Sequence, residues 1–211
     1  MQIKMSTVSV FCCLRGCLDG FKFNSTVPHI PRESPIQLDT AFMGYEVVIV
    51  KGGQRVCGAG AALGNAPLVQ SKSYFEVKVQ QGGSWSIGLA TRQTDLSLTK
   101  GGMDEFSWCL CSDHIIRHNK QELYKINISS GASGEIAGIQ EGDIVGVSFD
   151  HIQLKFYVNG TEIDFGVTNV KGTVFPALYV DDGAILDIIL DNFNYSPPSG
   201  FEKIMLEQSL L

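Results

Sequence analysis

The chain has 211 residues, of which 44% are hydrophobic and 18% are charged, and its formal net charge at pH 7 is −6. This composition indicates a folded domain with a sizeable core and excludes a disordered chain. The acidic balance, with lysine and arginine scattered, excludes a nucleic-acid partner held through its phosphates, and no apolar run reaches the ~18 residues that a membrane-spanning helix needs.

The first segment, residues 1–35, differs in composition from the rest of the chain. It begins with a cysteine-rich stretch in which Cys12, Cys13 and Cys17 lie among apolar residues. Residues 20–35 contain three prolines with polar spacers, which is typical of an extended linker. No secretory signal peptide is recognisable, so we expect a cytoplasmic protein whose cysteines remain thiols.

From residue 36 to about residue 191, strand patterns recur at short intervals and are separated by turn residues. Most of these segments alternate apolar and polar residues, as strands with one buried face do. The expected strands are Glu46–Lys51, Gln54–Gly58, Tyr74–Gln80, Trp85–Thr91, Ser107–Cys111, His114–His118, Val145–Asp150, Ile152–Val158, Thr161–Val167, Val174–Val180 and Ile185–Asp191. This rhythm predicts an all-β domain, a two-sheet antiparallel β-sandwich, over residues 36–195.

The strongest local signal is a hairpin centred on Asn159-Gly160. On its first strand Leu154, Phe156 and Val158 alternate with polar residues. Asparagine followed by glycine supplies the two positive-φ residues that a two-residue type I′ turn requires. We therefore expect a hairpin with one face in the core, in a scaffold that acts through the loops it holds.

Four sequence blocks in this region resemble the SPRY domain. They are YFEVKVQ at Tyr74–Gln80, GGSWSIGLATR at Gly82–Arg92, EGDIVGVSFDHIQLKFYVNG at Glu141–Gly160 and GTVFPALYV at Gly172–Val180. Each block alone is a weak signal, but four in the family's order are a strong one. The resemblance covers residues 36–195, and it implies two packed sheets that bind a peptide or protein at one end.

The same resemblance implies a partner-binding site on three loops, which are Gln81–Ser84, Ser97–Phe106 and Asp181–Gly183. The residues expected to contact a partner are Gly83, Ser84, Met103, Asp104, Phe106, Trp108, Asp181, Asp182 and Gly183. The two adjacent aspartates favour a basic or amide-rich ligand. The alternative interpretation is that these are ordinary surface turns.

The two tryptophans have different expected positions. Trp85 shares a strand face with Ile87 and Leu89, so we expect it in the core. Trp108 begins a strand beside a proposed loop, and both a core position and a surface position stay open. If exposed, Met103 and Phe106 would be the better anchors for a partner.

Neither metal binding nor catalysis finds support in the sequence. Cys109 and Cys111 fall on one face of a short strand near His114 and His118, but this spacing matches no usual zinc pattern. There is no nucleophile elbow and no phosphate-binding loop, and nothing places paired carboxylates across a cleft. We therefore expect a protein that is not an enzyme and needs no metal or cofactor.

The cysteines of the first segment have a separate interpretation. Reversible acylation of Cys12, Cys13 and Cys17 would attach the chain to a membrane, since two acyl chains suffice for stable anchoring. Initiation at Met5 instead of Met1 would bring them closer to the terminus. The alternatives are a redox or metal-binding tail and a leader packed on the domain.

Taken together, these patterns predict a non-catalytic protein-interaction module that binds a peptide or protein segment through loops at one end of the sandwich. Two other functions stay open, an acylated membrane-associated regulator and a lectin-like protein that binds carbohydrate. Residues 196–211 are expected to pack back onto the sandwich through an apolar segment, as one helical turn. The residues that would pack are Phe201, Ile204, Met205 and Leu206.

Overall fold

A computed structural model describes residues 35–127 and 138–206, which belong to one compact unit, Pro35–Leu211. The described residues form strands and turns, and no helix occurs among them. The strands are β1 (Leu38–Met43), β2 (Glu46–Val50), β3 (Arg55–Gly64), β4 (Ser73–Gln81), β5 (Ser84–Ala90), β6 (Ser107–Cys111), β7 (Ile115–His118), β8 (Gln121–Lys125), β9 (Ile144–Phe149), β10 (Gln153–Val158), β11 (Thr161–Thr168), β12 (Phe175–Asp181), β13 (Ile185–Ile189) and β14 (Glu202–Lys203).

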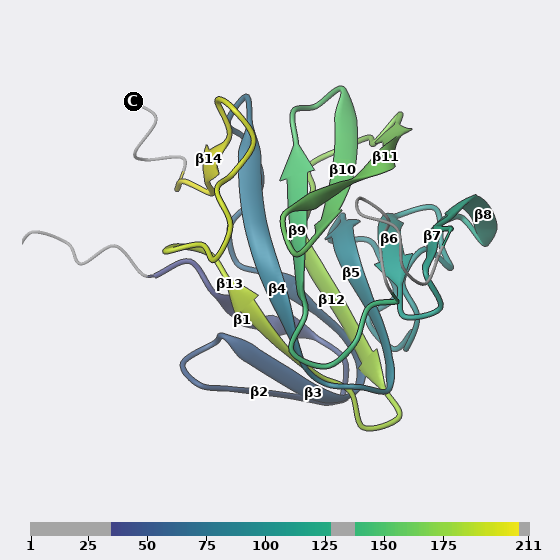
Figure 1. Ribbon diagram of the computed structural model, residues 1–211. Coiled ribbons are helices and arrows are strands. Elements are labelled where there is room, and N and C mark those ends of the chain that lie inside the picture. Colours follow the sequence, from purple (N-terminus) through teal and green to yellow (C-terminus); the bar gives the residue numbers. More distant parts are fainter. Residues whose placement is uncertain (1–34, 128–137, 207–211) are drawn as a thin grey trace, which may run out of the picture. The chain divides into compact units, whose positions relative to one another are not determined.

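Two antiparallel sheets pack face to face and share one strand (Figure 1). The first sheet has the order β1-β3-β12-β5-β6-β7-β8, and the second has the order β11-β10-β9-β4-β13-β3-β2. Strand β3 joins them, because its first half pairs with β2 and β13 and its second half pairs with β1 and β12. The predicted all-β sandwich is confirmed.

The main core lies between the sheets and follows the alternation of the sequence. Phe75 and Val77 of β4, Phe156 of β10, and Ile87 of β5 are each completely buried there. Trp85 joins the same cluster, as predicted. Burying each such large apolar side chain stabilises the fold by about 1.5–3 kcal/mol.

A second, smaller core covers the outer face of the first sheet. It contains Cys109 and Tyr179, on which the loop between β5 and β6 packs with Leu96 and Leu98. The amide of Gly101, in the same loop, donates a hydrogen bond of 3.1 Å to the Ser86 hydroxyl. This long loop is therefore folded down onto the sheet as a third layer.

The outer face of the second sheet is partly covered by the chain that follows β13. The carboxylate of Glu76 is buried and accepts hydrogen bonds from the Tyr74 hydroxyl (3.2 Å), the Asn194 amide (2.8 Å) and the Tyr195 amide (2.9 Å). The chain then forms β14, which runs parallel to the start of β4, and buries Ile204. A strand pairing thus occupies the position at which the sequence suggests a helical turn.

Local features agree with the expected hairpin. Asn159 and Gly160 have φ angles of 48° and 79°, which fits the predicted two-residue turn between β10 and β11. At the edge of the sandwich, the rings of Tyr124 on β8 and Phe165 on β11 stack with centroids 4.7 Å apart. Across the two described ranges, no helical segment is long and apolar enough to span a lipid bilayer.

Candidate functional site

Two turns from different parts of the chain meet at one end of the sandwich, at the lower edge of Figure 1. One joins β4 to β5 and the other joins β12 to β13, so each connects one sheet to the other. Ser84 pairs with Asp181 across the first sheet, and Gln81 pairs with Ile185 across the second. The sequence therefore folds two of the three predicted loops side by side.

The two turns fix each other's backbone. Gly83 has a φ of 133°, and a Cβ atom there would lie 2.6 Å from the Asp182 carbonyl oxygen and 2.7 Å from the Ala184 nitrogen. Only glycine fits so close to a neighbouring backbone. A third segment joins them, since the Gly82 amide donates a 2.8 Å hydrogen bond to the carboxylate of Glu141. These contacts hold the two turns against each other and against the segment that precedes β9.

An aromatic residue extends this surface toward β2. Gly60 of β3 pairs with Val180 of β12, and Ala59 pairs with Glu46 at the start of β2. Tyr45, which precedes Glu46, therefore lies at the same end, and its side chain is fully exposed. Nothing in the sequence marks it beyond its place in a turn.

We refer to this surface as the acidic end. It consists of Tyr45, Glu46, Gly82, Gly83, Ser84, Glu141, Asp181, Asp182 and Gly183. Four of its members are carboxylates, and among these Glu46, Glu141 and Asp182 are exposed. Exposed carboxylates that gather at one end of a domain attract cationic groups, the kind of ligand that the sequence favours.

The other four predicted residues lie elsewhere. Ser107 pairs with Ala90, at the end of β5 opposite to Ser84. Strand geometry puts about 20 Å between the two ends of β5. Met103, Asp104, Phe106 and Trp108 therefore belong to the opposite end of the first sheet, and the structure does not bring the nine residues into a single surface. They are separated because the loop starts where β5 ends.

Asp104 anchors its own loop. It accepts hydrogen bonds from the hydroxyls of Ser107 (2.6 Å) and Thr94 (2.7 Å) and from the amides of Phe106 (3.0 Å) and Asp95 (3.1 Å). Burial opposes its ionisation, but these donors outweigh burial and hold the pKa of Asp104 below its ordinary value. Its carboxylate oxygens are thus occupied within the loop.

Trp108 lies in the core and is only 3% exposed. Its indole stacks on the imidazole of His118, with ring centroids 4.6 Å apart. Met103 and Phe106 are half-buried. The sequence leaves the position of Trp108 open, and the structure places it in the core.

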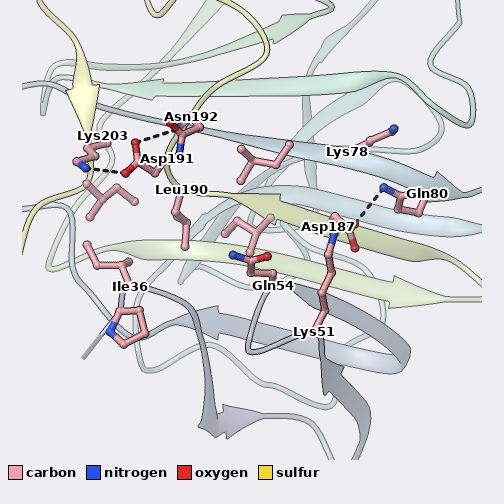
Figure 2. Close-up of a pocket in the computed structure, with 14 residues that line it drawn as sticks. Ile36, Lys51, Gln54, Lys78, Gln80, Asp187, Leu190, Asp191, Asn192 and Lys203 are labelled. Atoms are coloured by element: carbon pink, nitrogen blue, oxygen red, sulfur yellow. Dashed lines mark hydrogen bonds and ion pairs between the residues drawn. The ribbon is translucent and has the colours of Figure 1, made fainter. Parts of the chain in front are cut away.

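A groove of about 620 Å³ lies on the second sheet, away from the residues predicted to contact a partner (Figure 2). We call it the β13 groove. Its lining residues are Pro35, Ile36, Lys51, Gln54, Lys78, Gln80, Asp187, Ile188, Ile189, Leu190, Asp191, Asn192, Lys203 and Ile204. The sequence does not predict this groove, because the residues that line it come from five separate segments of the chain.

Asp187 is the most constrained charge in the β13 groove, with a side chain that is 5% exposed. It accepts hydrogen bonds from Lys51 (3.0 Å), from Arg55 (2.5 and 2.8 Å) and from Gln80 (3.0 Å). Burial opposes its ionisation, but Arg55 and Lys51 outweigh burial and hold the pKa of Asp187 below its ordinary value. The carboxylate therefore stays ionised, and the positive charges of Arg55 and Lys51 balance its negative charge.

Within residues 35–127 and 138–206, no group of three or more histidine, cysteine, aspartate or glutamate side chains is arranged to hold a metal ion. Cys109 and Cys111 are buried, and burial raises the pKa of both thiols. Cys12, Cys13 and Cys17 lie outside the described residues.

Known proteins share both the sequence and the architecture of this chain. A model of the SPRY domain family matches residues 72–193. Over 204 residues, the chain is 45% identical to the SPRY domain-containing protein 7 of Bos taurus and to that of Homo sapiens. Each of these alignments covers 96% of this chain and 98% of the relative.

Solved structures show the same fold at low sequence identity. The TRIM65 PSpry domain matches with a TM-score of 0.57 and 15% identity, over 74% of this chain and 90% of that one. The SPRY domain of human HERC1 matches with a TM-score of 0.58 and 12% identity, over 74% of this chain and 99% of that one. The match to the family model and the identity to the curated relatives confirm the resemblance seen in the sequence, and this chain belongs to the SPRY domain family.

Proposed function

We propose that this chain is a non-catalytic protein-interaction module whose acidic end binds a short basic or amide-rich segment of a partner protein. SPRY domains generally mediate protein interactions, which supports the class of function. The observation that carries the choice of surface is the contact between the two turns. Gly83 lies against Asp182 and Ala184 so closely that both turns keep a single backbone conformation.

A preformed surface binds efficiently because little conformational entropy is lost on docking. In this proposal the exposed carboxylate of Asp182 and the half-exposed one of Asp181 pair with lysine or arginine side chains of the partner. The fully exposed ring of Tyr45 supplies an apolar and cation–π contact beside them. An affinity in the micromolar range, about −8 kcal/mol, is typical of such a short segment.

The proposal gives the other predicted residues a supporting role. The amides of Asn119 and Lys120 donate hydrogen bonds to the carbonyls of Asp104 (3.0 Å) and Gly102 (2.8 Å). These bonds fasten the loop between β5 and β6 to the turn between β7 and β8. We therefore assign Asp104 and Trp108 to the rigidity of the scaffold, and Met103 and Phe106 to the half-buried wall of that loop.

A selection from a library of random peptides tests the proposal. The full chain is used as bait, and we expect the selected peptides to be enriched in lysine, arginine, asparagine and glutamine. The Asp181→Lys/Asp182→Lys variant should lose their binding. The Asp164→Lys/Glu105→Lys variant makes the same change of net charge at exposed positions away from the acidic end, and it should retain binding. Equal binding by both variants would remove the acidic end as the site.

A further inference from the structure

The β13 groove combines a hollow with an uneven charge distribution. The cationic side chains around it are Lys51, Arg55, Lys78 and Lys203. Two carboxylates, Asp187 and Asp191, face these four cations, which leaves a local excess of two positive charges. The chain as a whole carries −6. A positive hollow on an acidic protein is therefore a distinct feature of this surface.

Lys78 differs from the other three cations, each of which forms an ion pair within the described residues. It lies beside Asp187 in the register of β4 and β13, and Asp187 lies beside Arg55 in the register of β13 and β3. Arg55 and Lys51 occupy the carboxylate of Asp187. Within the described part of the chain, the Lys78 ammonium forms neither an ion pair nor a hydrogen bond with another residue. Lys78 is half-buried as a residue, and its ammonium is thus available to a ligand.

The remaining walls of the groove are suited to a peptide. In Figure 2, Leu190 lies between the Lys203–Asp191 pair and the Asp187–Gln80 pair, and Ile36 lies below the Lys203–Asp191 pair, so the lining offers apolar side chains beside two polar ends. Both apolar side chains are only half-buried. At one end the Lys203 ammonium lies 2.7 Å from Asp191, and its side chain is 54% exposed, so its remaining donors face solvent.

We propose that the β13 groove is a second binding site, which takes an acidic segment of a partner protein. The segment carries aspartate or glutamate side chains on both sides of an aliphatic residue. Its carboxylates pair with Lys78 and Lys51 at one end and with Lys203 at the other, and its aliphatic side chain packs on Ile36 and Leu190. The charge of this ligand is opposite to that of the ligand proposed for the acidic end, so the two sites stand independently.

The test uses the full-length chain and a fluorescein-labelled peptide of sequence Glu-Asp-Glu-Leu-Glu-Asp, measured by fluorescence anisotropy. The comparison peptide is Gln-Asn-Gln-Leu-Gln-Asn, which has the same shape without the charges. We expect the acidic peptide to bind in a salt-dependent manner and the neutral peptide to bind at least about tenfold more weakly, or ~1.4 kcal/mol. Equal binding of the two peptides would overturn the proposal.

Variants locate the site. Lys78→Glu and Lys203→Glu should each weaken binding of the acidic peptide by about tenfold. Lys125→Glu and Lys171→Glu make the same charge change at exposed positions on β8 and between β11 and β12, and they should leave binding unchanged. Circular dichroism of each variant confirms that it is folded, and Lys78→Gln repeats the test without reversing the charge.

Two further results would contradict the proposal. One is an equal loss of peptide binding in the groove variants and the control variants, which would show that binding depends on the net charge of the chain and not on the groove. The other is a salt-sensitive, concentration-dependent increase in molecular mass by light scattering that disappears in Lys78→Glu. That result would show that a second copy of this chain, instead of a segment of a different protein, occupies the groove.

Discussion

Substitution of Gly83 by alanine probes the contact between the two turns of the acidic end. The backbone φ of 133° is one that L residues rarely adopt, and this alone costs about 1–3 kcal/mol. The new Cβ would lie 2.6 Å and 2.7 Å from two backbone atoms of the facing turn. Restoring ordinary contact moves one turn by roughly 1 Å, at a cost of about 1–3 kcal/mol. The total is about 2–6 kcal/mol.

Gly142 offers a matched control for this substitution. Its φ of 93° is also positive, but a Cβ atom there would have nothing within 4 Å. Gly142→Ala therefore carries the backbone cost alone, about 1–3 kcal/mol. Urea denaturation should show that Gly83→Ala is the more destabilised variant by about 2 kcal/mol. Equal free energies of unfolding would refute the close contact of the turns and the rigidity argued from it.

Three further outcomes follow from individual residues. Glu76→Gln replaces one of two carboxylate oxygens with a donor, and each oxygen accepts two hydrogen bonds, one from the backbone and side chain of Asn194 and the other from Tyr74 and Tyr195. The variant should therefore destabilise by about 2–4 kcal/mol and speed amide exchange at Asn194 or Tyr195, whereas Glu162→Gln on the surface should do neither. His114 accepts a 2.8 Å hydrogen bond from the Ile139 amide, and burial lowers its pKa below the ordinary 6.5. The stability that His114 contributes is therefore fully present above its pKa in the unfolded chain and is lost as the pH falls through its lower pKa in the folded protein. Urea denaturation between pH 7.5 and 5 should show a fall in the free energy of unfolding, and this fall should be smaller in His114→Gln. Replacement of Cys12, Cys13 and Cys17 by serine should abolish hydroxylamine-sensitive palmitate labelling of the full chain in cells, and an unlabelled wild-type chain would end the acylation prediction.

Where one face of a strand is buried, the sequence of this chain predicts the fold well. The alternation in β4, β5, β9 and β10 places Phe75, Ile87 and Phe156 inward, as the structure confirms. The pattern fails where that condition is absent. Strand β3 continues to Gly64 through glycine and alanine residues, which have low β-propensity. It extends that far because its second half pairs with β12 in the other sheet. Strand β8 is a polar edge strand and shows no alternation.

Sites made by long-range pairing are harder to anticipate. The aspartates at 181 and 182 are visible in the sequence, but their position beside Gly83 depends on the register of β5 with β12. The loop between β5 and β6 looks like a free loop, because nothing in its residues shows that Gly101 packs on Tyr179. The row formed by Lys78, Asp187 and Arg55 likewise comes from three strands distant in the chain.

Amide hydrogen exchange of the full chain tests the proposed function most directly. It is measured with and without a basic peptide selected by the wild-type protein. We predict that protection on binding concentrates in residues 81–84, in residues 181–184 and at Tyr45, and that it disappears in the Asp181→Lys/Asp182→Lys variant. Protection confined to the loop between β5 and β6, with the acidic end unchanged, would contradict the account.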